Sequence, residues 1–232
     1  CRKRRRTTIN GPRRTKTSMI LHIASGECAA NSLRNTLPDA KILPFNEAMC
    51  EGDTCAPIYG DSFCALRAAA YGVSLSEYLK KSPRGVLQTA DEYGGMELYF
   101  DGDMFCAANA VTLLAYLEQE KFGGIIRFNL VEQDGSADAL ERFPLRPVGW
   151  LAAYESIFLQ NKPYKTSIEV FDRALPLLFE YRRKDNEIAR FARENAAMDE
   201  HALIRAMLSR FRAYGLGDTA AKRIIQEQIK QQ

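Results

Sequence analysis

The sequence lacks a membrane-spanning segment. No apolar run approaches the roughly 20 continuous residues that a transmembrane helix needs. The most apolar stretch with a helical pattern, residues 104–117, is shorter and contains Asn109. The basic start of the chain has no apolar core of the kind found in secretory signals. We therefore expect a cytoplasmic protein without a membrane partner.

Clustered metal ligands are also scarce. The six cysteines, at positions 1, 28, 50, 55, 64 and 106, include no C-x-x-C pair, and the chain has two histidines. A structural zinc site needs several Cys or His ligands close together, so no such site is predicted. Free thiols in a reducing cytosol are the default for this pattern.

The signatures of common nucleotide cofactors and of nucleophilic catalysis are incomplete. Gly26 has no glycine two and five residues further on, and the chain has no Gly-Lys-Ser/Thr motif, so NAD and P-loop ATP binding are unsupported. Cys28 falls in the first turn of a predicted helix, a position at which the helix macrodipole can activate a thiol as a nucleophile. It has no histidine base nearby, because His22 lies within a predicted strand and His201 far along the chain. The cofactor, and whether the protein is an enzyme, stay open.

Basic charge is concentrated at one end. Residues 1–18 contain eight Lys or Arg and no acid, so removing these eight charges from the formal +3 leaves −5 for the rest. A mildly acidic body argues against general nucleic-acid binding. The basic head could serve as a nucleic-acid arm or a targeting peptide. We favour a disordered head outside the fold, with Met19 as the natural start, because the first strand begins there.

Alternating apolar strands and helices dominate the next part of the chain. This alternation predicts an α/β fold with a mainly parallel, four-stranded, doubly wound (Rossmann-like) sheet over residues 19–135. The strands are expected at 19–24, 41–44, 96–100 and 125–131, and the helices at 28–37, 61–71, 74–81 and 104–119.

Residues 136–232 are expected to form a helical region packed on the α/β domain, with no further strand. Helices are predicted at 150–159, 167–182, 199–214 and 218–230, with Pro176 kinking or splitting the second and an exposed charged stretch at 182–186. The last two helices have helix-turn-helix spacing. An alternative function is therefore a regulatory or interaction protein that binds DNA through Lys222, Arg223, Gln226 and Gln228, although Asp218 and Glu227 oppose it.

Polar residues follow the predicted strands at their carboxyl ends, where open parallel sheets bind ligands. The long connection over residues 45–60 is of a length that is usually functional. We therefore predict a small-molecule or nucleotide-type site there, with these candidate binding residues: Ser25, Glu27, Cys28, Asn46, Glu47, Asp53, Arg67, Asp101, Asp103 and Asn129.

Three of these candidates also have a structural interpretation. Glu27 and Asp103 lie where a carboxylate favours a helix N-terminus. Arg67 is expected to pair with an acid, or to hold an anion. Glu27, Glu47, Asp101 and Asp103 could bind Mg²⁺ or Mn²⁺ if they converge, but their spacing alone predicts no metal site.

Four stretches resemble a bacterial family catalogued as domain of unknown function eighteen-thirty-five. They read Leu-His-Ile-Ala-Ser-Gly-Glu-Cys-Ala-Ala, Leu-Pro-Phe-Asn-Glu-Ala-Met-Cys-Glu-Gly-Asp, Phe-Asp-Gly-Asp-Met-Phe-Cys and Phe-Asn-Leu-Val. The resemblance covers about residues 19–150, and the helical tail is like the family's C-terminal half. It implies no particular activity. Members often have Gly-Asp-Ser where this chain has Gly26, Glu27 and Cys28, which favours the acid at 27 over the thiol as a functional group.

Overall fold

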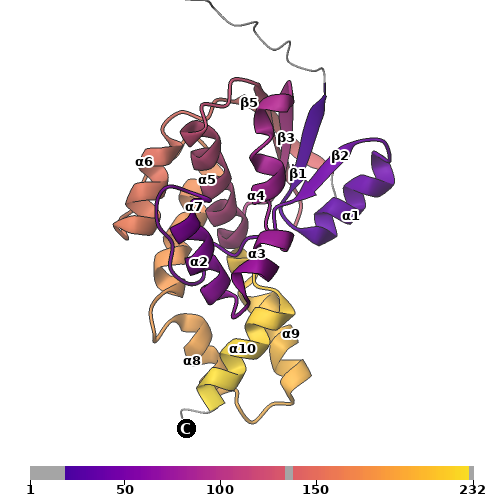
Figure 1. Cartoon of the computed structure of the whole chain (residues 1–232). Coiled ribbons are helices and arrows are strands. Elements are labelled where there is room, and N and C mark those ends of the chain that lie inside the picture. Colours follow the sequence, from indigo (N-terminus) through magenta and orange to yellow (C-terminus); the bar gives the residue numbers. More distant parts are fainter. Residues whose placement is uncertain (1–18, 134–137, 230–232) are drawn as a thin grey trace, which may run out of the picture.

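The computed structural model describes residues 19–133 and 138–229 (Figure 1). The basic head predicted for residues 1–18 lies outside the described residues. None of the helices within these two ranges combines the length and the apolar content needed to cross a bilayer.

A five-stranded sheet forms the centre of the molecule, in the order β2-β1-β3-β4-β5. The first four strands run parallel, and β5 is antiparallel to β4. The predicted α/β, doubly wound class is therefore confirmed. The strands are β1 (Ile20–Ala24), β2 (Lys41–Pro44), β3 (Gly95–Phe100), β4 (Ile125–Val131) and β5 (Ala139–Leu145).

The expectation of four strands, with none after residue 135, was wrong because of β5. This edge strand pairs with β4 from Ile126↔Leu145 to Val131↔Ala139, so the sheet continues to residue 145. Most of its residues are exposed, and it contains Pro144. Edge strands tolerate charge and proline, because one side has no partner strand. The apolar pattern that identified the other strands is therefore absent here.

Helices cover the two faces of the sheet unequally (Figure 1). Helix α1 (Glu27–Thr36) packs on one face through Ala30 and Leu33, which contact Ala24 and Val131 of the sheet. The opposite face packs against α5 (Met104–Gln119) and, with it, forms the main core. Helices α6 (Trp150–Tyr154) and α7 (Glu169–Tyr181) pack in turn against α5. The fold therefore has one thick and one thin layer around the sheet.

The remaining helices complete the thick layer and the C-terminal region. Helix α7 continues through Pro176 as one helix instead of being split, and α8 was not predicted. Asn186 caps α8, because its side-chain oxygen accepts from Ala189 N at 2.8 Å. The helix was not predicted because it directly follows the charged stretch 182–186, which was expected to be an exposed segment. The bounds are α2 (Asp61–Ala70), α3 (Leu75–Lys81), α4 (Arg84–Leu87), η1 (Ala90–Glu92), α6 (Trp150–Tyr154), the π-helical turn η2 (Glu155–Leu159), α7 (Glu169–Tyr181), α8 (Glu187–Glu194), α9 (Glu200–Arg210), η3 (Arg212–Tyr214) and α10 (Asp218–Ile229).

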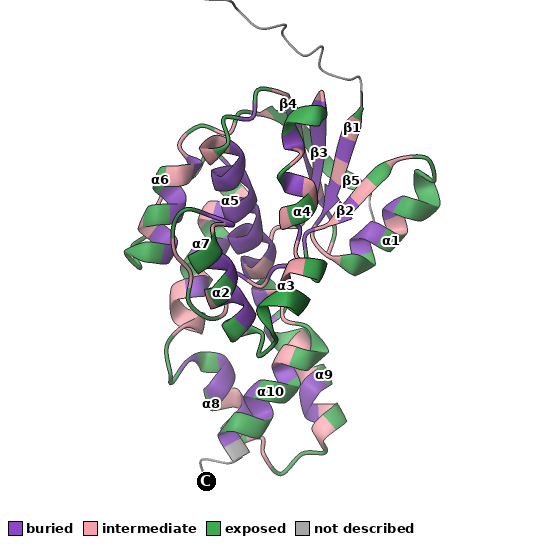
Figure 2. Ribbon diagram, viewed as in Figure 1, coloured by how far each residue is buried: buried purple, intermediate pink, exposed green. Residues whose placement is uncertain are grey.

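Helix α5 is buried along almost its whole length (Figure 2). Its one amide side chain in the core, Asn109, is fully buried and holds the long connection that follows β2. Asn109 Oδ1 accepts from Met49 N at 3.1 Å, and Asn109 Nδ2 donates to Glu47 O at 2.6 Å. Because both backbone groups are satisfied from the core, this connection is an ordered part of the fold.

Replacing Asn109 with Ala is expected to lower the free energy of unfolding by about 2–4 kcal/mol, since two buried backbone groups lose their partners. Thr112→Val on the same helix is the matched control. The Thr112 hydroxyl donates to Ala108 O, which is already within the helix, so its loss should cost below about 1 kcal/mol. Urea unfolding of the full chain measures both, and an equal effect of the two changes would contradict the anchoring role of Asn109.

Candidate functional site

A cavity of about 440 Å³ lies at the carboxyl ends of the parallel strands. The chain passes from β1 to β2 on one side and then returns to place β3 on the other side of β1. The helices after β1 and β3, α1 and α5, consequently lie on opposite faces. This topological switch point is where open α/β sheets bind ligands, and the cavity is there.

Five of the ten predicted site residues line this cavity. Ser25, Glu27 and Cys28 come from the turn between β1 and α1, and Asp101 and Asp103 from the turn between β3 and α5. The acids of the first and third strand exits therefore meet at one rim, as the sheet pattern predicts. Whether they bind a ligand stays a prediction.

Asp103 is the most constrained of these residues. It caps α5, because its Oδ1 accepts from Cys106 N at 2.7 Å, which confirms the capping interpretation. Its Oδ2 accepts from Gln133 Nε2 at 3.1 Å, and its backbone N–H donates to Asp101 Oδ1 at 2.9 Å. Only 6% of Asp103 is exposed, so this carboxyl group is fixed in the cavity wall.

Burial raises the pKa of Asp103 to about 8, and the nearby charge of Asp101 contributes in the same direction. Two carboxyl groups this close repel each other when both are ionised, so the pair retains a proton near neutral pH. The cavity therefore contains a group that can donate or accept a proton, a common property of functional sites.

Asp101, Asp103 and Cys106 form a candidate ligand set for a metal ion, with one ligand atom from each lying within 4.8 Å of the others. Carboxylate oxygens suit Mg²⁺ or Mn²⁺. Burial and the neighbouring carboxylates raise the pKa of the Cys106 thiol well above its usual range, so the sulfur stays protonated and is a poor ligand for these ions. The two carboxylates are the groups here that could hold a hard cation.

The C-terminal region supplies one wall of the cavity, below the carboxyl ends of the strands in Figure 1. Arg212 Nε donates to Gln133 Oε1 at 2.6 Å, and Gln133 also bonds Asp103. Gly215 has φ +67°, and a Cβ there would lie 2.1 Å from Asp103 Oδ2. Glycine is the residue that permits both this conformation and this approach. Sequence reasoning did not identify Arg212 or Gly215 as site residues, because no local pattern links the tail to β3.

The first turn of α1 faces the cavity without a side-chain cap. Glu27 instead pairs with Arg34 at 2.8 Å on the surface of the helix, and Cys28 is exposed. The first N–H groups of a helix have no intrahelical partner, and the helix dipole makes this end positive. The α1 side of the cavity therefore suits an anionic group, opposite the acidic wall of Asp101 and Asp103.

Glu47 and Arg67 lie away from the cavity, in the core under the long connection. The fully buried Arg67 pairs with Glu47, Nε to Oε2, at 3.5 Å, as expected for this cation. Its guanidinium also donates to Ala48 O at 2.8 Å and to Glu51 O at 2.5 Å. Tyr78 donates to Glu47 Oε1 at 2.6 Å. This network anchors the connection after β2, and the charge of Arg67 is paired within the core.

The other three candidates also lie outside the cavity. Asn46 and Asp53 are exposed on the connection, which turns away from the sheet edge after β2. Asn129 is inside β4 and fully buried on the α1 face, where Nδ2 donates to Glu97 Oε2 at 3.0 Å and Oδ1 accepts from Arg142 Nε at 2.6 Å. The exit of β4 nevertheless reaches the cavity through Glu132 and Gln133, so the prediction that all four strand exits share one rim was wrong for β2 alone.

Two of the four tail residues predicted to contact DNA form ion pairs within the chain. Lys222 pairs with Glu200 at 2.9 Å, and Arg223 pairs with Glu51 at 2.5 Å. The second pair joins α10 to the connection after β2, so Arg223 has a role within the fold. DNA binding by this tail stays a prediction.

No protein-family model matches this chain, and no curated protein matches it.

Removing the buried cation should destabilise the fold strongly. For Arg67→Met we expect a loss of about 3–5 kcal/mol in the free energy of unfolding, because Glu47 is left buried without its partner. Adding Glu47→Gln to this variant should restore part of the loss, since no carboxylate then remains in the core. The control is Arg173→Met, which removes an exposed pair with Glu169 and should cost about 0.5 kcal/mol or less. If Arg67→Met were as mild as its control, the anchoring account would be wrong.

The raised pKa of Asp103 predicts a pH dependence of stability. The folded protein holds this proton between the usual pKa of 3.8 and about 8, where the unfolded chain has lost it. The contribution to stability is therefore full below about pH 4 and is lost as the pH rises toward 8, by at most about 1.4 kcal/mol per unit. Asp103→Asn should flatten this slope, whereas Glu132→Gln, an exposed acid at the same cavity, should leave it. Urea unfolding at several pH values between about 5 and 8 measures the slopes, and identical slopes in wild type and Asp103→Asn would refute the assignment.

Proposed function

We propose that this protein binds a small, nucleotide-type molecule in the cavity at the carboxyl ends of β1, β3 and β4. One observation carries the proposal: the cavity lies at the switch point of the sheet, and a distant part of the chain supplies one of its walls through Gly215 and Arg212. Its volume of about 440 Å³ is within the range of small-molecule pockets.

The two sides of the cavity supply complementary chemistry for such a ligand. The uncapped N-terminus of α1 offers backbone N–H groups to a phosphate or carboxylate. Asp101 and Asp103 offer oxygen acceptors to sugar hydroxyl groups, or to a divalent cation that accompanies the phosphate. An anion beside several acids needs one of these two arrangements, since direct repulsion would otherwise exclude it.

Two further predictions belong to this proposal. The described cysteines are free thiols, which agrees with a reducing compartment, and we propose a cytoplasmic protein. We also propose membership of the domain-of-unknown-function family that the sequence resembles, on the residues 19–150 that carry the likeness. Neither addition specifies a reaction.

A panel of nucleotides and sugar phosphates, each with and without Mg²⁺, tests ligand binding by thermal shift and calorimetry on the full chain. At least one compound should raise the melting temperature. Gly26→Leu adds a side chain at the rim, where a Cβ meets nothing within 4 Å, and should weaken binding about tenfold or more without unfolding the protein.

Gly85→Leu is the matched control, because a Cβ at Gly85 also meets nothing within 4 Å and Gly85 is remote from the cavity lining. It should bind like the wild type. Absence of a shift with every compound, or equal affinity of the two glycine variants, would overturn the proposal.

A further inference from the structure

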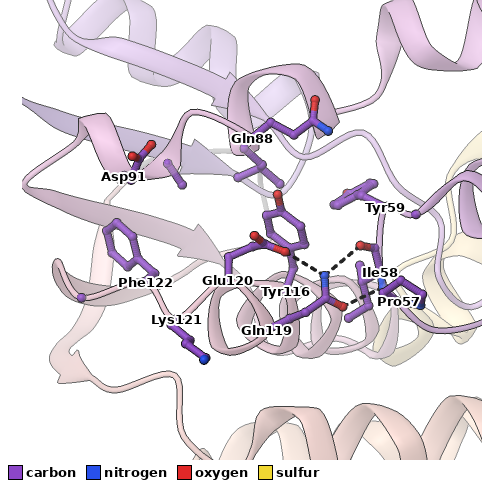
Figure 3. Close-up of a pocket in the computed structure, with 14 residues that line it drawn as sticks. Pro57, Ile58, Tyr59, Gln88, Asp91, Tyr116, Gln119, Glu120, Lys121 and Phe122 are labelled. Atoms are coloured by element: carbon purple, nitrogen blue, oxygen red, sulfur yellow. Dashed lines mark hydrogen bonds between the residues drawn. The ribbon is translucent and has the colours of Figure 1, made fainter. Parts of the chain in front are cut away.

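A cavity of about 760 Å³ at the opposite, amino-terminal edge of the sheet is held together by bonds within the chain (Figure 3). The side-chain amide of Gln119 accepts from Ile58 N at 2.8 Å and donates to Ile58 O at 3.1 Å. Gln119 Nε2 also donates to Glu120 Oε1 at 3.0 Å. These bonds join the end of α5 to the connection before α2, so this wall of the cavity has a structural role.

A third cavity, of about 390 Å³, lies on the α1 face of the sheet. Helix α1 supplies one side of it, and the strands β1, β3 and β5 supply the other through His22, Glu97, Tyr99 and Arg142. Its volume is within the range of small-molecule pockets. No described residue lines both this cavity and the one proposed for the nucleotide-type ligand.

The sheet side of this cavity is polar, whereas the faces of a parallel sheet are normally apolar. Six polar side chains lie there in two rows that follow the strand register: His22, Glu97 and Arg127 in one row, and Tyr99, Asn129 and Arg142 in the next. Glu97 is 8% exposed and Asn129 is fully buried, so water does not surround these groups. Apolar residues would stabilise a buried face at least as well. The polar rows therefore indicate a binding surface.

A chain of hydrogen bonds orients Arg142 beside the cavity. Asn129 Nδ2 donates to Glu97 Oε2 at 3.0 Å, and Asn129 Oδ1 accepts from Arg142 Nε at 2.6 Å. Asn129 Nδ2 also donates to Leu98 O at 3.2 Å, which fixes the orientation of the amide. The two terminal nitrogens of Arg142 bond no other described residue. An arginine held in this way presents two parallel donors, the arrangement that binds a carboxylate.

His22 adds a neutral donor to the same cavity. Its Nδ1 lies 3.1 Å from the Tyr99 hydroxyl, and the two rings stack with centroids 5.9 Å apart. Burial lowers the pKa of His22 against the opposing effect of Glu97, and burial raises the pKa of Tyr99. The imidazole is therefore neutral and the hydroxyl protonated near neutral pH. When the hydroxyl donates to Nδ1, His22 Nε2 carries the ring proton and can donate to a ligand.

The charges of the lining favour a ligand with a single negative charge. Arg142 is the cation of the lining, while Glu97 is paired with Arg127 Nη1 at 2.5 Å and Asp138 is exposed. One guanidinium matches one carboxylate, whereas a phosphate dianion would meet two acids and a single cation. A carboxylate has about four acceptor positions, so Glu97 can also accept from an ammonium or hydroxyl group of the ligand.

We propose that this cavity binds a small amino or hydroxy acid, with its carboxylate on Arg142 and His22 and its ammonium or hydroxyl group on Glu97. The oriented guanidinium, the second nitrogen of the imidazole and the buried acid line one cavity, and this juxtaposition carries the assignment. The site is independent of the nucleotide-type cavity, since the two have separate linings.

Calorimetry on the full chain tests the site with the common amino acids, lactate, glycerate and inorganic phosphate as probes. At least one amino or hydroxy acid should bind with a Kd below about 1 mM, and its carboxamide, which lacks the negative charge, should not. Arg142→Gln should weaken this binding about tenfold or more. The control Arg146→Gln removes an arginine outside the lining and should bind like the wild type. Both arginines are exposed, so both variants should remain folded.

The ring signals of the two histidines give a site-specific readout by NMR. The bound acid should shift the signals of His22 and leave those of the exposed His201 unchanged. Gly26→Leu, at the other cavity, should bind the acid like the wild type.

Three results would overturn the proposal. The first is failure of every acid to bind with a Kd below about 1 mM. The second is phosphate binding as tight as that of the best acid. The third is binding that survives Arg142→Gln and is lost in Gly26→Leu, which would place the acid in the other cavity.

Discussion

The burial of helix α5 is the constraint on which the rest of this structure depends. Thirteen of its 16 residues are buried, between the sheet on one side and α6 and α7 on the other. Its position fixes three features at once: Asp103 at its start, Asn109 in its middle and Tyr116 near its end. A helix held this tightly fixes the positions of the groups at its two ends relative to each other, because a close-packed interior has low compressibility.

The two edges of the sheet consequently have different properties. At the carboxyl edge, Asp103 caps α5, and Gly215 of the C-terminal region lies directly against its carboxylate. At the amino edge, the end of α5 meets acids and aromatic rings instead. The polar core between them, built on Arg67 and Glu47, belongs to neither edge and serves to order the connection after β2.

The sequence predicted the parts of the fold that follow from local pattern. The bounds of α5 and β4 agree with the expectation, because a long apolar run reaches Leu117, two residues before α5 ends at Gln119, and another ends with β4 at Val131. β5 was missed because an exposed edge strand needs no apolar alternation. Half of the predicted site residues line the cavity. The residues directly after β1 and β3 converge there, as sheet topology requires. The direction of the chain after β2 depends instead on the buried contacts of Arg67, which the sequence pattern does not specify. Likewise, no local signal brings Gly215 to Asp103, since that contact joins segments 112 residues apart.

Native-state hydrogen exchange along α5 is the measurement that tests this account most directly. If α5 is the element on which both sheet edges depend, amides from residues 108–117 should exchange only through global unfolding, with an opening free energy equal to that of the whole protein and the same denaturant dependence. An opening of α5 at a lower free energy, while amides of β1 and β3 remain protected, would contradict the account.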